Sequence, residues 1–147
     1  MNNVDKMRII EKNMKLDNQF TYVLFKMKIK KSAKQVHDFV EDVVSRGKKV
    51  YIYGASTRGN TLLQACGLDD KLISKAVERN PIKYGKKFLG IPIISEEEAR
   101  ADNPDYFLVL PWFFKEEFIK REEDYLKNGG KLIFPLPEFE IYEYKGK

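Results

Sequence analysis

Apolar residues repeat at helical spacing through the first third of the chain, with lysines between them: Tyr22, Phe25, Ile29, Val36, Phe39 and Val43. This pattern predicts one long amphipathic helix over about residues 20–46, or two consecutive helices. Gly47 is expected to end the helix, because a glycine just past a helix adopts the left-handed cap. Residues 1–17 are weakly patterned and are expected to form an N-terminal arm.

Beyond residue 47, short apolar runs alternate with helical patterns. The predicted strands are residues 49–53, 72–77, 91–94, 106–110 and 132–134. Helices are expected after the loop at 54–60, after the capping pair Ser95 and Glu98, and from Pro111 to the glycines at 129 and 130. This alternation is typical of an α/β fold with a mainly parallel sheet and helices on both faces, a three-layer sandwich. We expect residues 18–147 to form this domain, with the long helix as its first element.

Ligands of such sheets bind beyond the carboxyl ends of the strands, which directs attention to loops 54–60, 78–90 and 111–114. In the first loop Gly54 permits a tight turn, and the free amides of the following helix attract an anion. Thr57 is expected to cap that helix, and Arg58 has the shape to clamp a phosphate. The spacing matches neither GxGxxG nor a Walker loop, so a tight turn without a ligand is the alternative. The candidate binding residues here are Gly54, Ala55, Ser56, Thr57, Arg58, Gly59 and Asn60.

The other two loops contribute an acid and an aromatic residue. Glu78 follows the second strand, where an acid bonds ribose hydroxyls in dinucleotide folds, or is simply an exposed loop acid. Trp112 either stacks on a base or sugar or belongs to the core. The remaining candidates on this edge are Asn80, Pro81, Lys83 and Pro111.

Composition and charge exclude several classes of protein. The 147 residues carry a net charge of +5, and residues 1–31 account for it with eight basic and three acidic groups. A charge confined to one terminal segment argues against a nucleic-acid-binding face. No apolar run resembles a membrane span or a signal peptide, so we expect a cytoplasmic protein without membrane contact. With His37 as the lone histidine and Cys66 as the lone cysteine, we expect no metal site and no catalytic residue in this chain.

Five stretches, taken in order, resemble a known family. They are residues 47–63, Glu-Arg-Asn-Pro at 78–81, Gly-Ile-Pro-Ile at 90–93, residues 104–112 with Leu-Pro-Trp, and Gly-Gly-Lys at 129–131 leading to Pro-Leu-Pro at 135–137. Over about residues 20–140 the chain is similar to the C-terminal domain of bacterial sugar-nucleotide (NDP-deoxysugar) C-methyltransferases. These enzymes act in deoxysugar and surface-polysaccharide pathways.

The resemblance implies a Rossmann-like domain that helps to hold a nucleotide-linked sugar. In that family, a zinc-binding domain and a domain for S-adenosylmethionine precede it, so the cofactor is expected on a missing domain or a partner and not in this chain. The loop 54–60, residues 78–81, Pro111 and Trp112 become the substrate contacts. Two positions depart from the family pattern: Glu78 stands in place of Asp, and Phe113 in place of Asn.

We therefore expect a nucleotide-sugar-binding domain of a C-methyltransferase, inactive alone. The alternative is a stand-alone interaction or scaffold module, whose apolar stripe docks a methyltransferase domain or subunit, or a second copy of the chain. A fragment of an NAD(P)-dependent oxidoreductase fits less well, because the glycine spacing is wrong and no hydride-transfer partner is visible.

Overall fold

The computed structural model describes residues 1–146 and divides the chain into two compact units, Met1–Lys31 and the remainder. The first unit holds helix α1 (Asn3–Asn13) and the first turns of α2 (Gln19–Ser45). Asn2 caps α1, because its side chain accepts a hydrogen bond of 2.9 Å from the Asp5 amide. The segment expected to be an arm thus contains a helix. The boundary expected at residue 17 stays a prediction.

Helix α2 is a single unbroken helix, which decides between the two alternatives left by the sequence. Its last turns belong to the second unit, where Val36, Val40 and Val43 are buried. The left-handed Gly47, with φ of +79°, follows its end as predicted. None of the helices within residues 1–146 has the length and apolar character needed to cross a bilayer.

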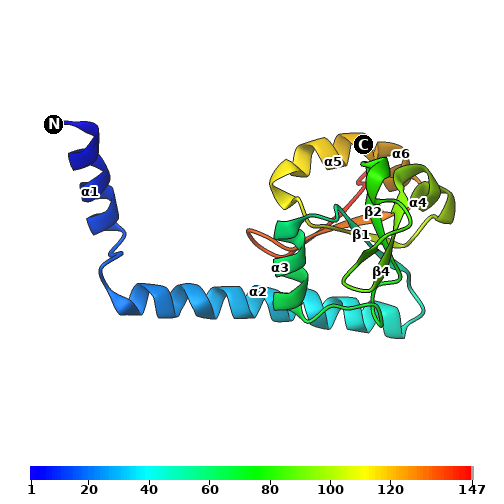
Figure 1. The fold of residues 1–147 in the computed structure, drawn as a ribbon, viewed down its shortest axis with the longest axis horizontal. Coiled ribbons are helices and arrows are strands. Elements are labelled where there is room, and N and C mark those ends of the chain that lie inside the picture. The colour runs from blue at the N-terminus through cyan, green and yellow to red at the C-terminus, as the bar shows by residue number, and fades with distance from the viewer. Residues whose placement is uncertain (147) are drawn as a thin grey trace. The chain divides into compact units, whose positions relative to one another are not determined.

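The second unit is built on a seven-stranded sheet in the order β3-β4-β2-β1-β5-β6-β7. Figure 1 labels β1, β2 and β4 of this sheet. Its strands are β1 (Val50–Tyr53), β2 (Lys75–Glu78), β3 (Lys87–Phe88), β4 (Ile91–Ser95), β5 (Tyr106–Val109), β6 (Lys131–Phe134) and β7 (Glu140–Glu143). The five central strands are parallel, and β3 and β7 pair antiparallel at the two edges. Because the central strands are buried on both faces, they read in the sequence as apolar runs.

Each face of the sheet carries its own core. One core joins the end of α2 and helix α3 (Thr57–Cys66) to one side of the strands, around Val40, Ile52 and Leu63. The other core lies under α4 (Glu96–Asp102), α5 (Lys115–Arg121) and α6 (Glu123–Lys127), around Phe107 and Phe118. The predicted α/β sandwich with a mainly parallel sheet and a long N-terminal helix is therefore confirmed.

Two predicted elements differ in detail, and two strands were not predicted. The second strand covers Lys75–Glu78 rather than 72–77, because the buried Ile73 lies in a turn, with its amide bonded to the Asp69 carbonyl at 2.9 Å. The predicted helix from Pro111 is three pieces, a 3-10 turn η2 (Trp112–Phe114), α5 and α6, and it breaks at Glu122. The edge strands β3 and β7 were not predicted. The capping of α4 by Ser95 is confirmed, since its hydroxyl accepts from the Glu98 amide at 3.1 Å.

Candidate functional site

The three loops singled out in the sequence meet at one place in the fold. The chain runs from β1 to its neighbour β2 on one side and later returns as β5 on the other side of β1. Strand order reverses at this point, and open α/β sheets bind ligands beyond the carboxyl ends of the strands at such a reversal. Residues 54–60 follow β1, residues 78–83 follow β2, and Pro111 and Trp112 follow β5. The fold therefore brings the predicted segments to one edge of the sheet.

Gly54 allows the first and third of these segments to touch. Its φ is +94°, and a Cβ atom added there would lie 2.7 Å from Cδ and Cγ of Pro111. Gly59 makes a similar approach, because a Cβ would meet Leu110 Cδ1 at 2.6 Å. The Gly54 amide also donates to the Val77 carbonyl at 2.9 Å. These glycines serve the close packing of three strand ends.

The start of α3 is capped by Ser56 and not by Thr57, so that prediction was wrong. The helix begins at Thr57, and the hydroxyl of the preceding Ser56 accepts from the Gly59 amide at 3.2 Å. The Arg58 guanidinium lies 5.5 Å from the centre of the exposed Phe113 ring, a cation–π contact. Asn60 accepts a hydrogen bond of 2.8 Å from Gln64. Arg58 is thus oriented by an aromatic residue on the neighbouring loop.

Lys83 joins the loops that follow β1 and β2. Its ammonium donates to the Ala55 carbonyl at 2.7 Å and to Oε2 of Glu78 at 2.9 Å. The other Glu78 oxygen accepts from the backbone amides of Arg79 and Asn80 at 2.9 and 3.4 Å. Burial alone would raise the pKa of Glu78, but Lys83 and these amides hold that pKa below its ordinary value. The acid at this edge is therefore charged and held in place.

Pro81 and Asn80 shape the same loop. The Asn80 side chain accepts from the Ile82 amide at 3.1 Å, and Pro81 is the first residue of the short 3-10 helix η1 (Pro81–Lys83). This turn directs Lys83 back toward Glu78. Both Asn80 and Pro81 are exposed.

The contribution of the Glu78–Lys83 pair to the free energy of unfolding depends on pH. Because the pKa of Glu78 is lowered on folding, the contribution is present above the ordinary value of 4.5 and is lost as pH falls through the lower folded value. We expect Glu78→Gln to cost under about 1 kcal/mol at neutral pH, since the pair is partly exposed. The cost should shrink as the pH is lowered below about 4. Urea unfolding at a series of pH values measures it.

The partner of Glu78 provides the matched control. Lys83→Met should remove most of this pH dependence, whereas Lys86→Met, on the same loop, should leave it unchanged. A cost of Glu78→Gln that is the same at every pH would contradict the assignment.

The aromatic residues after β5 divide between core and surface. Trp112 is half-buried, packs against the core under α5, and contacts Phe113 edge-on at 5.6 Å between ring centres. Phe113 and Phe114 are about half exposed, at 47% and 48%. Phe113 was noted in the sequence only as a departure from the family pattern, and its contact with Arg58 was not predicted. An exposed aromatic pair directly after a buried strand is the signal that could have found it.

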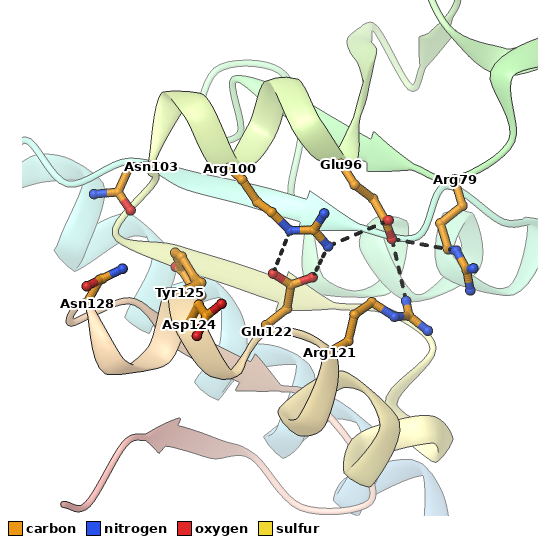
Figure 2. A pocket seen from close by; sticks show the side chains of 9 residues that line it. All are labelled: Arg79, Glu96, Arg100, Asn103, Arg121, Glu122, Asp124, Tyr125 and Asn128. Atoms are coloured by element: carbon orange, nitrogen blue, oxygen red, sulfur yellow. Dashed lines mark hydrogen bonds and ion pairs between the residues drawn. The ribbon is translucent and has the colours of Figure 1, made fainter.

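A second polar cluster lies on the face covered by α4, α5 and α6 (Figure 2). Its centre is Glu122, which is 1% exposed and accepts two hydrogen bonds from Arg100, at 3.1 and 2.7 Å. The hydroxyl of Tyr53, the last residue of β1, lies 2.9 Å from Glu122 and also contacts Glu96. The bond to Glu122 raises the pKa of Arg100, and burial with the nearby carboxylates raises that of Tyr53. Arg100 is therefore charged, and the Tyr53 hydroxyl is neutral, at neutral pH.

No candidate residue pointed to this cluster, because its members come from parts of the chain that are far apart in sequence: β1, α4 and the junction of α5 and α6. One signal was present: Glu122 follows Phe118 by four residues and precedes Tyr125 by three. It therefore stands on the apolar stripe of a predicted helix, where a buried acid needs a partner.

The lone histidine and cysteine lie near each other between α2 and α3. His37 Nδ1 is 2.9 Å from the Cys66 carbonyl oxygen. Burial raises the pKa of the Cys66 thiol to about 11, so the thiol stays protonated at neutral pH. Within residues 1–146, no group of three or more histidine, cysteine or acidic side chains is placed to hold a metal ion.

Comparison with known proteins gives two matches. The model of the family described as the C-methyltransferase C-terminal domain matches residues 1–137. C-methyltransferase NovU from Streptomyces niveus is 43% identical over 106 residues, which are 71% of this chain and 25% of that protein. The chain thus spans about a quarter of the length of this relative. Both matches confirm the resemblance drawn from the five sequence stretches.

Proposed function

This chain belongs to the C-methyltransferase C-terminal domain family, and on that premise we propose that it holds a nucleotide-linked sugar for methyl transfer. The observation that carries the proposal is the meeting of loops 54–60, 78–83 and 111–112 at the reversal of strand order. A sheet edge of this kind is where α/β folds place nucleotide ligands. The deoxysugar identity of the substrate is part of the same proposal.

The chemistry of the three loops suits a sugar diphosphate. The amides at the start of α3 and the Arg58 guanidinium would receive the phosphates, since a helix N-terminus and a guanidinium both favour oxyanions. The Glu78 carboxylate would accept from hydroxyl groups, in exchange for part of its contact with Lys83. Phe113 and Trp112 present aromatic faces to a base or sugar ring.

We infer that S-adenosylmethionine, the cofactor that the family resemblance implies, is held outside this chain. Gly54 and Gly59 of the turn after β1 pack against the Pro111 ring and Leu110, so both glycines serve contacts within the domain. We place this cofactor on a missing domain or a partner, and propose that the present chain alone transfers no methyl group. Methyl transfer by the purified chain would overturn that part of the proposal.

Binding of the substrate class can be measured by thermal shift. Thymidine, uridine, guanosine and cytidine diphosphates and their sugars are tested at saturating concentration, with S-adenosylmethionine and NAD alongside. A ligand at about 100 times its dissociation constant adds about 2.7 kcal/mol of stability. We expect one nucleotide diphosphate to raise Tm by about 5–10 °C, since a chain of this size shifts about 2–4 °C per kcal/mol.

Two variants locate the binding. Arg58→Ala is expected to remove most of the nucleotide-induced shift, because it deletes the proposed phosphate clamp. Arg46→Ala, at the far end of α2 in an exposed pair with Asp42, is the matched control and should keep the full shift. The absence of any nucleotide-induced shift, or an equal loss in both variants, would contradict binding at this edge.

One observation favours the second candidate function, a module that docks a partner protein. No residue of Met1–Lys31 is buried, and large apolar side chains on it are exposed, among them Phe20, Leu24, Phe25 and Met27. Exposed apolar patches of this kind mark interaction sites. The partner would be a methyltransferase domain or subunit, or a second copy of the chain. Sedimentation over a range of concentrations tests self-association, and a strict monomer leaves only the first kind of partner.

A further inference from the structure

A cavity of about 650 Å³ lies between α4 and the α5–α6 pair, on the face of the sheet opposite α3. This volume is within the range of small-ligand pockets, about 300–1,000 Å³. Three guanidinium groups line it, from Arg79 after β2, Arg100 on α4 and Arg121 at the end of α5 (Figure 2). Apart from Arg79, which stands between Glu78 and Asn80, none of its lining residues comes from the loops proposed to hold the nucleotide sugar, so the cavity needs its own explanation.

The three arginines differ in how closely their guanidinium groups approach acceptor atoms. Arg100 makes the two hydrogen bonds to the buried Glu122 and is fixed by them. Arg79 and Arg121 instead approach the Glu96 carboxylate at 3.7 and 3.5 Å, which is longer than an ordinary N–H···O hydrogen bond. A guanidinium carries five N–H donors. Arg79 and Arg121 therefore have donors available for a better-placed acceptor.

The charge balance favours an anion as that acceptor. Arg79 and Arg121 share the single Glu96 carboxylate, because Glu122 is bonded to Arg100. Asp124, a third acid of the lining, is exposed, and so is the Arg79 side chain, at 66%, so water screens both of these groups. The Arg121 side chain is 25% exposed, so a bond that it forms is partly shielded from solvent.

We propose that this cavity is a second binding site, for an oxyanion group of a small metabolite, with Arg79 and Arg121 as its donors. Arg100 is bonded to Glu122 and forms part of the lining of the cavity. Glu96 pairs with Arg79 and Arg121 when no ligand is bound, and a bound anion would compete with it for these two arginines. A phosphate group and a carboxylate group share the chemistry that these donors recognise. The proposal goes beyond the nucleotide-sugar function, because all of its residues except Arg79 lie outside the loops of that site.

The test is calorimetric titration of the full chain with inorganic pyrophosphate in one arm and citrate in the other, at constant ionic strength. All chains carry Arg58→Gln, which removes the proposed nucleotide-phosphate clamp and isolates the cavity. We expect saturable binding of at least one probe, and the tighter probe tells whether the site takes phosphates or carboxylates. Arg79→Gln and Arg121→Gln are each expected to weaken it at least about tenfold, as for loss of a charge-assisted hydrogen bond.

Glu96→Gln is the variant that separates a binding site from a purely structural network. It removes the competing charge but keeps an oxygen to accept from Tyr53, so it is expected to tighten anion binding several-fold. Arg46→Gln is the matched control and should bind as the parent does. No saturable binding of either probe, an equal weakening in Arg46→Gln, or weaker binding in Glu96→Gln would each overturn the proposal. None of these outcomes bears on nucleotide binding at Arg58, which is measured separately.

Discussion

Replacement of Arg100 by alanine is expected to lower the free energy of unfolding by about 3 kcal/mol. The side chain of Glu122 is 1% exposed and receives two charge-assisted hydrogen bonds from Arg100. Loss of the guanidinium leaves a buried carboxylate with only the Tyr53 hydroxyl at 2.9 Å. Because Arg100 itself is 42% exposed and water reaches the gap, we place the cost at the lower end for a broken buried pair. Urea unfolding followed by circular dichroism measures it.

Two further variants test the cause of this loss. Arg46→Ala breaks an exposed ion pair with Asp42 and is expected to cost under about 0.5 kcal/mol. The double variant Arg100→Met with Glu122→Leu removes both charges and continues the apolar stripe of Phe118 and Tyr125. It should recover most of the lost stability, since buried pairs are replaceable by packed apolar groups. A single Arg100→Ala variant as stable as Arg46→Ala would contradict the role given to this pair.

Gly54→Ala is expected to destabilise the fold by a similar amount, about 3 kcal/mol. A methyl group there meets the Pro111 ring at 2.7 Å, and the backbone φ of +94° is unfavourable for any residue with a Cβ atom. The clash lies where β1, β2 and β5 end together, so the loops can separate only by giving up packing in the core. Thermal and urea unfolding report the stability, and the nucleotide-induced shift in Tm reports the site.

Gly85→Ala is the matched control for this variant. Gly85 also has a positive φ, +75°, but a Cβ atom there has no neighbour within 4 Å. Gly85→Ala should therefore lower the free energy of unfolding by about 1 kcal/mol, the cost of the strained backbone alone, without a steric clash. Pro111→Ala added to Gly54→Ala should recover the difference between the two glycine variants. Equal losses in Gly54→Ala and Gly85→Ala would show that contact with Pro111 does not matter.

The sequence predicted the sheet well where strands are buried on both faces and poorly where they are not. The run at 106–110 is recognisable because every position of β5 faces core or helix. Ile73 is equally buried but lies in a turn, so apolar character alone misplaced the start of β2. The edge strand β7 carries glutamate at both ends and is mostly exposed, and its pattern resembles that of a surface loop.

The candidate site was predictable in its location but not in its contacts. The alternation of elements predicts a parallel sheet, and the shared carboxyl-end edge of parallel strands is enough to bring loops 54–60 and 78–83 to one edge. The bond from Lys83 to the Ala55 carbonyl depends on how the turn at Pro81 is oriented, which no local pattern specifies. Likewise, Glu122 at the break between α5 and α6 bonds to Arg100 of another helix, and a helical pattern from Pro111 onward does not specify such a contact.

The two antiparallel strands at the ends of the sheet also limit how copies of this chain can meet. An edge strand with free backbone groups is a template for intermolecular β-pairing, and proteins block such pairing with short strands and charged side chains. At one end β3 is only two residues long and begins at a lysine, Lys87. At the other, Glu140 and Glu143 bracket β7. Sheet extension from one molecule to the next is therefore discouraged at both edges, which favours helices and loops as the contact surfaces of any assembly.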